Sequence, residues 1–137
     1  MSDTNAAPEF KKYPDHIVTL EPVVGSVRVE AFGQTVADTI AAIRVRESRY
    51  APVIYVPRGD VRFDLLQPSE LTTHCPFKGD ASYWSIRVGD HHIGDAAWGY
   101  ASPYDEVAEL AGYVAFYTNR IDGIYMNDEM QPRSELT

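Results

Sequence analysis

The sequence of 137 residues has a single cysteine, Cys75. One cysteine cannot form a disulfide within the chain, and a chain without disulfides fits a reducing compartment. The first residues are polar and lack the apolar segment of a secretory signal, and no apolar stretch approaches the length of a membrane-spanning helix. These absences predict a cytoplasmic protein that does not bind to a membrane.

Runs of lysine or arginine are also absent. The chain has 12 basic and 20 acidic residues, which gives a net charge of -8. A protein with this charge and no local basic patch repels phosphate backbones. We therefore exclude a nucleic-acid polymer as a partner, whereas a single nucleotide can still be held by a few well-placed groups.

The spacings typical of metal sites are missing. The sequence has no Cys-x-x-Cys, His-x-x-x-His or Glu-x-x-His pattern. A zinc site needs three or four converging ligands, so we predict no metal and no other cofactor.

What the sequence does contain is a series of short β-type segments, and its length fits one domain. Residues 26–32 alternate apolar and polar side chains, residues 53–56 are apolar on both faces, and residues 84–98 form two segments around a Gly-Asp turn. Residues 39–46 fit either a short helix or a strand over their second half, and we favour the strand. This pattern predicts an all-β, mainly antiparallel fold, as a small sandwich or an open barrel.

The domain is predicted to span residues 26–127 and to contain one short helix. Ser102 resembles an N-cap, Pro103 suits the first helical position, and Gly112 suits the end of the helix. Residues 1–25 contain three prolines and are predicted as an extended N-terminal arm. Residues 128–137 are predicted as a polar tail.

Residues 72–84, Thr-Thr-His-Cys-Pro-Phe-Lys-Gly-Asp-Ala-Ser-Tyr-Trp, concentrate reactive and polar side chains in one stretch. Cys75 is a candidate nucleophile if a base keeps it as a thiolate, and His74 is the adjacent candidate base. However, neighbouring side chains on an extended backbone point to opposite faces, and cysteine is often simply buried. A structural Cys75 is therefore the favoured alternative.

Lysine followed by glycine, as at Lys78, occurs in loops that bind phosphate, although the rest of the P-loop pattern is absent. We expect Arg58 and Arg62 to lie on the same side and, together with Lys78, to hold a phosphate or a carboxylate. Asp60 fits either acid–base work or a turn. Large aromatic residues from separate strands cannot all fit one core, so some should line a second apolar surface. The candidate ligand-binding residues are Tyr55, Arg58, Asp60, Lys78, Tyr83, Trp98 and Tyr113, which we expect around one shared cavity.

A resemblance to a known family rests on motifs spread over residues 15–126. They are Val56-Pro57-Arg58, Asp60-Val61-Arg62, Asp64-Leu65-Leu66, the run from Thr73 to Trp84, Asp95-Ala96-Ala97-Trp98 and the run from Gly112 to Tyr117. Together they resemble the DUF427 family of bacterial and fungal proteins, a domain of unknown function that also carries a nucleotidyltransferase-like label. The resemblance implies a compact fold of the β-tent type. Several β-tent proteins hold zinc with two pairs of cysteines, and the single cysteine here excludes that site.

Three functions follow as alternatives. The first is the binding of a small anionic or aromatic metabolite in a pocket around the loop at residues 73–83. The second is an enzyme that acts on a nucleotide or a similar anionic molecule with His74 or Cys75. The third is an interaction module that uses the N-terminal arm as a clasp in a homodimer.

Overall fold

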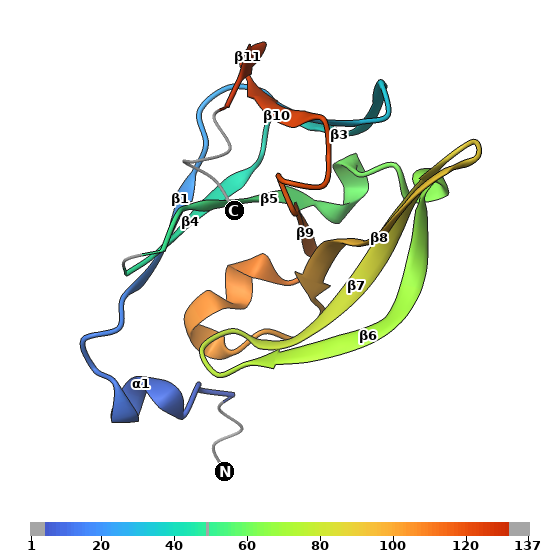
Figure 1. Cartoon of the computed structure of the whole chain (residues 1–137). Helices are drawn as coiled ribbons and strands as arrows, with labels where there is room; N and C mark the ends of the chain where they lie inside the picture. Colours follow the sequence, from blue (N-terminus) through green and yellow to red (C-terminus); the bar gives the residue numbers. More distant parts are fainter. Residues whose placement is uncertain (1–4, 49, 132–137) are drawn as a thin grey trace.

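The computed structural model describes residues 5–48 and 50–131. Over these residues the fold is all-β and mainly antiparallel, as predicted, and its strands form two sheets (Figure 1). Neither sheet closes into a barrel in this part of the chain. No helix within the described ranges is long and apolar enough to cross a membrane.

The larger sheet has seven strands over the described residues. In spatial order they are β1 (Val18–Pro22), β4 (Ile43–Glu47), β5 (Val53–Pro57), β9 (Tyr113–Phe116), β8 (His91–Tyr100), β7 (Gly79–Val88) and β6 (Leu66–Cys75). Each strand is antiparallel to its neighbours. The predicted central strand at residues 53–56, the strand at the end of residues 39–46 and the hairpin at residues 84–98 are confirmed in this sheet.

The smaller sheet comprises four strands of the described chain, β11 (Glu129–Met130), β10 (Gly123–Met126), β2 (Val27–Ala31) and β3 (Gln34–Thr39). In β2, Val27 and Val29 are fully buried, whereas Arg28 and Glu30 are only half-buried. The alternation of apolar and polar side chains in residues 26–32 therefore marks a strand with one face in the core, as predicted.

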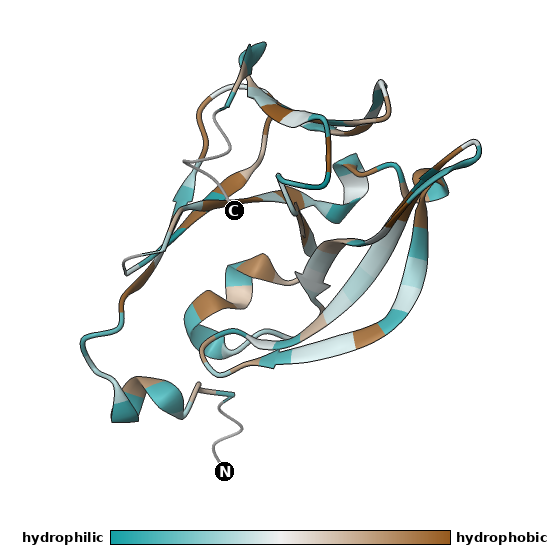
Figure 2. Ribbon diagram, viewed as in Figure 1, coloured by the Kyte–Doolittle hydropathy of each residue, from teal (hydrophilic) through white to brown (hydrophobic). Residues whose placement is uncertain are grey.

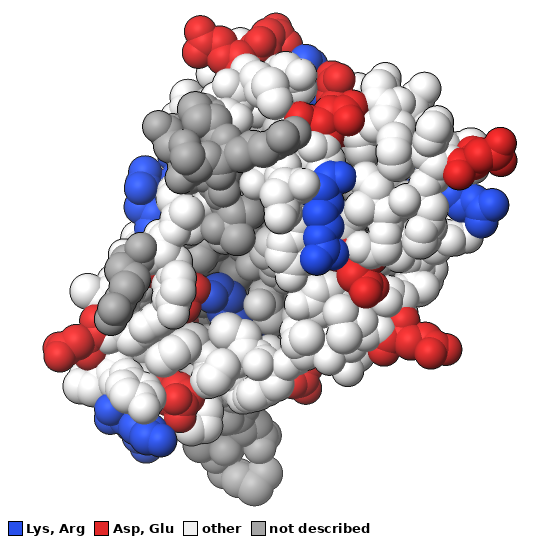
Figure 3. Space-filling view, in the orientation of Figure 1, with Lys and Arg blue, Asp and Glu red and all other residues white. Residues whose placement is uncertain are grey.

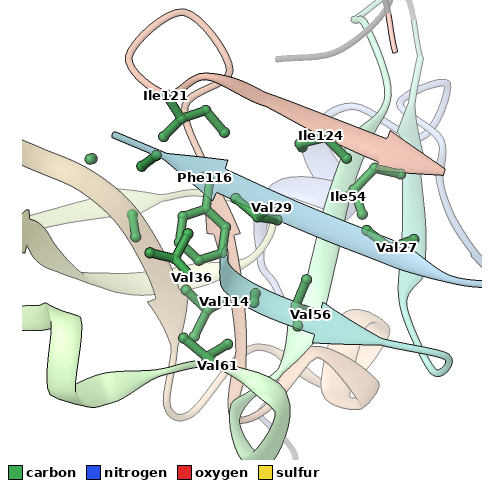
Figure 4. Packing of buried hydrophobic residues seen from close by; sticks show 14 of the residues in the cluster. Val27, Val29, Val36, Ile54, Val56, Val61, Val114, Phe116, Ile121 and Ile124 are labelled. Carbon is green, nitrogen blue, oxygen red and sulfur yellow. The ribbon is translucent and has the colours of Figure 1, made fainter. Parts of the chain in front are cut away.

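The main core lies between the two sheets. Val29 of β2 packs in one cluster with Val56 of β5 and with Val114 and Phe116 of β9 (Figure 4). Figure 2 shows the underlying pattern, in which hydrophobic positions along the strands are interspersed with hydrophilic ones. This packing fixes which face of the larger sheet points toward the smaller one.

The opposite face of the larger sheet carries a second apolar cluster. Tyr55, Ala115 and Trp98 are register partners across β5, β9 and β8, and partners in antiparallel strands share a face. The 3₁₀ helix η3 (Asp105–Leu110) adds Val107 and Leu110, which are fully buried in this cluster. The candidate site lies on this face.

The predicted helix after Ser102 is wrong in type and starting point. Only residues 105–110 are helical, as a 3₁₀ helix with a break at Val107, and Tyr104 before it is extended. The cause is tertiary, because the Tyr104 N–H donates to the Lys78 carbonyl oxygen (2.9 Å) and the Asp105 carboxylate accepts the N–H of Asn5. Groups that would cap a helix beginning at Pro103 are engaged by other segments instead.

The arm expected over residues 1–25 is not uniformly extended and is partly integrated into the fold. It contains a short helix, α1 (Glu9–Lys12), and strand β1 of the larger sheet. The Ala7 N–H also donates to the Glu106 carboxylate (2.9 Å), so the arm joins η3 to the edge of the sheet. Of the predicted tail at residues 128–137, residues 129–130 form β11, and residues 132–137 lie outside the described residues.

Most of the stretch predicted as a loop at residues 73–83 is a β-hairpin. Strand β6 continues to Cys75 and β7 begins at Gly79, so the turn consists of residues 76–78 alone. The chain break expected at residues 67–69 is only a register shift within β6, between Pro68 and Thr72. Cross-strand pairing with β7 outweighs the local turn preference of proline and serine here.

Candidate functional site

A cavity of about 370 Å³ opens on the face of the larger sheet that carries the second cluster. Its walls come from β4, β5 and their connection, from β8, from the end of β6 with the β6–β7 turn, and from His16, two residues before β1. They are formed by His16, Val45, Glu47, Tyr50, Ala51, Val53, Tyr55, Cys75, Pro76, Phe77, Lys78, Trp98 and Tyr100. The seven-stranded sheet is thus curved enough to bring its two halves around one space (Figure 1).

Lys78 turns inward at the tip of the β6–β7 hairpin. The Lys78 N–H donates to the Cys75 carbonyl oxygen (3.3 Å), which closes the turn. Gly79 follows with φ of +119°, a conformation that glycine adopts without strain. This backbone leaves the Lys78 residue only 7% exposed, so the turn places an ammonium group inside the molecule.

Glu47, at the end of β4, compensates this charge. One oxygen of its carboxylate accepts a hydrogen bond from the Lys78 ammonium group. The other oxygen accepts a hydrogen bond from Nε2 of His16, at 2.7 Å. Burial opposes ionisation of Glu47, but the hydrogen bonds and charges of Lys78 and His16 outweigh it and hold the pKa of Glu47 below its usual value. The cavity is therefore bordered by an ionised carboxylate with two partners.

The inner wall of the cavity is aromatic and uncharged. The Trp98 Nε1–H donates to the Tyr55 hydroxyl at 3.3 Å, and the two rings meet edge to face. Burial raises the pKa of Tyr55 and the pKa of Tyr100, so both hydroxyls stay protonated. These groups can exchange hydrogen bonds with a ligand but do not supply a phenolate.

The N-terminal arm forms the rim. The His16 ring stacks on Phe77 with a centroid distance of 3.7 Å, and Phe10 of α1 meets Phe77 edge to face at 4.9 Å. An adjoining hollow of about 450 Å³ shares His16, Phe77 and Tyr50 with the cavity. The Tyr50 residue is exposed at this junction, so one aromatic side chain borders both spaces.

The structure separates the two candidate catalytic residues. Cys75 is half-buried and borders the cavity, whereas His74 is exposed and bound to Asp80 through Nδ1 at 2.7 Å. Both lie in β6, so the alternation of a strand directs them to opposite faces. His74 does not reach the cavity that Cys75 borders.

The candidate ligand-binding residues do not surround one shared cavity. Tyr55, Lys78 and Trp98 line the cavity, but Arg58 and Tyr113 border a different hollow. The expectation of a single hollow is therefore wrong for those two residues.

Two further candidates are engaged in the fold. The Asp60 carboxylate accepts the Thr39 hydroxyl at 2.7 Å. The hydroxyl of Tyr83 lies 3.0 Å from Oγ1 of Thr73, and the tyrosine is buried in the second cluster. Neither residue is among those that line the cavity.

Four polar residues of the cavity are not among the candidates predicted from the sequence, namely His16, Glu47, Tyr50 and Tyr100. His16 lies in the segment predicted as a separate arm, and Glu47 is the last residue of β4, beyond the alternating positions that predict the strand. A carboxylate directly after the alternating residues 43–46 was the available signal, because a buried lysine requires such a partner.

The charges on the surface give no sign of a polyanion site. Figure 3 shows acidic and basic side chains interspersed on one face, with no continuous basic patch among the described residues. The same view shows a basic group set back in a hollow beside acidic atoms. Within the described ranges, no group of three or more His, Cys, Asp or Glu side chains is placed to hold a metal ion.

The sequence from residue 19 to residue 127 matches the family described as Domain of unknown function (DUF427). The chain belongs to the DUF427 family. The match begins at the second residue of β1 and ends just after β10, and so includes every strand that lines the cavity and both sheets apart from Val18 and β11. Among the cavity residues, His16 alone precedes the matched range. No curated protein matches this DUF427 chain.

Proposed function

We propose that this DUF427 domain binds a small, planar aromatic metabolite in the cavity between β4, β5, β8 and the β6–β7 turn. The observation that carries the proposal is a space of about 370 Å³ with aromatic walls and two protonated tyrosine hydroxyls. Binding sites for small molecules commonly combine such apolar walls with a few polar groups that set orientation. Tyr55 and Tyr100 are those orienting groups.

Charge favours an uncharged aromatic ligand over an anion. Lys78 is the cation in the cavity wall, and the Glu47 carboxylate already compensates it. An entering anion would have to compete with Glu47 for Lys78 and would also be repelled by Glu47. A neutral ring with one hydroxyl or amide group avoids both costs and can still bond to the tyrosines.

The exposed side chain of Tyr50 offers a test that spares the fold. In a Trp84→Phe background Trp98 is the single tryptophan, so its fluorescence reports on this cavity. We expect 4-nitrobenzyl alcohol, a neutral aromatic quencher, to quench Trp98 saturably. Tyr50→Ala should weaken this binding about fivefold or more, because it removes an aromatic wall worth roughly 1 kcal/mol.

Tyr13→Ala is the matched control, because Tyr13 is similarly exposed and borders only the adjoining hollow. We expect its binding to equal that of the Trp84→Phe parent and the melting temperature of both variants to be unchanged. Quenching of Trp98 that rises linearly without saturation, or equal losses in the two tyrosine variants, would contradict the proposal.

An enzyme that uses Cys75 is the second candidate. Cys75 and His16 border the same cavity, and Glu47 holds the His16 ring through Nε2. Histidine oriented by a carboxylate is the usual arrangement for activating a thiol. His74, which the sequence suggested for this role, is bound to Asp80 on the other face.

This candidate predicts a fast reaction of Cys75 in the folded protein. Iodoacetamide at pH 7 should alkylate Cys75 at least tenfold faster than it alkylates the same thiol in urea, because only the thiolate reacts. His16→Ala should remove the acceleration. Mass spectrometry over time measures both rates, and a folded thiol that reacts more slowly than the unfolded one rules out the nucleophile.

A further inference from the structure

A second cavity, of about 270 Å³, lies on the other face of the larger sheet. Ser82 and Val114 are register partners of Gly99 across β7, β8 and β9, and all three border this space. Tyr83 and Trp98 form the next row, and successive residues of a strand point to opposite faces. The sheet therefore lies between this cavity and the aromatic one that Trp98 borders, and Tyr100 at the end of β8 borders both.

Arg58 brings an uncompensated positive charge to this second cavity. Its guanidinium carbon lies 4.2 Å from the centroid of the Phe63 ring and 5.9 Å from that of the Trp84 ring. Within the described residues Arg58 has no carboxylate partner, whereas the nearby Arg62 is paired with Asp64 at 2.6 Å. Aromatic rings position the Arg58 side chain and leave its N–H donors available.

The residues that border this cavity differ in charge from those of the other described cavities. The aromatic cavity pairs Lys78 with Glu47, and its neighbouring hollow contains both Lys12 and Asp15. A fourth hollow, of about 300 Å³, is bordered by Glu21 and Glu109. Of the four cavities described, the one at Arg58 alone has a basic side chain and no acidic one.

This difference matters in a chain with a net charge of -8. The average field of such a protein repels anions, so an anion can bind only where a local cation is free of competing carboxylates. A guanidinium group presents two parallel N–H donors that match the oxygens of a carboxylate. The Trp84 ring beside it offers a flat apolar surface for the body of the same molecule.

We propose that the cavity bordered by Arg58, Ser82 and Trp84 is a second ligand site, which takes a small aromatic carboxylate. The guanidinium of Arg58 binds the carboxylate, the Ser82 hydroxyl offers a further hydrogen bond, and the ring of the ligand lies against Trp84. The two cavities share Tyr100 but no charged residue, so the carboxylate proposed for this site depends on Arg58 and not on the groups that bind a neutral ring on the other face.

The two tryptophans of the chain make the two sites separately observable. Trp84 borders the Arg58 cavity and Trp98 borders the other one. In a Trp98→Phe background, we expect 4-nitrobenzoate to quench Trp84 saturably. The neutral 4-nitrobenzyl alcohol should bind at least tenfold more weakly there, because it lacks the carboxylate.

Arg58→Gln should weaken the binding of 4-nitrobenzoate at least tenfold, while Arg58→Lys should give an intermediate loss, because lysine keeps the charge but not the paired donors. Arg62→Gln is the matched control, since Arg62 is a nearby exposed arginine that does not border the cavity. Inorganic phosphate should compete poorly, because it has no ring to lie against Trp84.

Equal affinities of the Arg58→Gln and Arg62→Gln variants would overturn the proposal. Equal quenching by the acid and the alcohol would also overturn it, because a site of that kind is apolar and not specific for an anion. Circular dichroism establishes that each variant is folded. If Arg58→Gln fails to fold, the comparison of Arg58→Lys with Arg62→Lys decides the question in the same way.

Discussion

Replacing Glu47 by glutamine is expected to lower the free energy of unfolding by about 3 kcal/mol, because removal of one partner leaves the Lys78 charge buried without compensation. This value lies at the lower end of the usual cost of breaking a buried ion pair, since the Glu47 side chain is still 17% exposed to solvent. Urea unfolding followed by fluorescence measures the difference. The same carboxylate also holds His16, so the variant should loosen the rim of the aromatic cavity.

The double variant Glu47→Gln/Lys78→Met separates the ion pair from other effects. With both charges removed, most of the lost stability should return, because an apolar side chain suits a position that is only 7% exposed. If the double variant is as unstable as Glu47→Gln alone, the pairing is not what stabilises this region.

The same pair predicts how stability depends on pH. The pKa of Glu47 is lowered in the folded protein, so its contribution is complete above the ordinary value of 4.5 and is lost as the pH falls through the folded pKa. The difference in unfolding free energy between wild type and Glu47→Gln should therefore shrink in acid. Urea titrations at pH 7 and at pH 3 provide this comparison.

The fold was predictable wherever a local pattern reports burial. In β2, Val27 and Val29 alternate with charged residues, which indicates a strand with one face in the core and the other toward solvent. In β5 both faces are apolar, which indicates a strand in the interior of the sheet. The segment after Ser102 was mispredicted, because backbone bonds to Lys78 and Asn5 override a local capping signal. A pattern of a few consecutive residues cannot indicate hydrogen bonds to residues that are distant in the sequence.

The candidate site was predictable only in part. The stretch at residues 72–84 does contribute Lys78 and Cys75 to the aromatic cavity, and Tyr55 and Trp98 do line it. Glu47, however, is 31 residues from Lys78 in sequence, and their contact depends on the curvature of a seven-stranded sheet. No residue spacing encodes that curvature.

The separation of Arg58 from Lys78 has a similar cause. The side to which a strand residue points depends on its register in the sheet, and a difference of one residue reverses it. Neither Arg58 nor Lys78 lies in a strand, because Arg58 begins the 3₁₀ helix η1 after β5 and Lys78 ends the β6–β7 turn. No alternation along the sequence therefore indicates the face to which either side chain points. Ser82, Gly99 and Val114 form the row of the sheet that borders the Arg58 cavity, whereas Trp98 in the next row borders the aromatic one.

Gly99 in that row gives the second large effect that we expect. A Cβ atom at this position would lie 2.5 Å from the carbonyl oxygen of Tyr113 and 3.5 Å from the Trp84 ring. The obstacle is backbone oxygen in the neighbouring strand β9, which cannot move without disturbing the sheet. Gly99→Ala should therefore destabilise the protein by about 3 kcal/mol, the upper end of the cost of overpacking.

Gly94→Ala is the matched control, because it lies in the same strand and its added Cβ would meet only His92, at an ordinary distance of 3.9 Å. We expect this variant to unfold at the same urea concentration as wild type or slightly above it, since alanine restricts the unfolded chain. Equal unfolding midpoints for the two variants would show that β8 and β9 do not need this close approach. A loss confined to Gly99→Ala would instead locate the requirement at the strand pair that forms the wall between the two proposed sites.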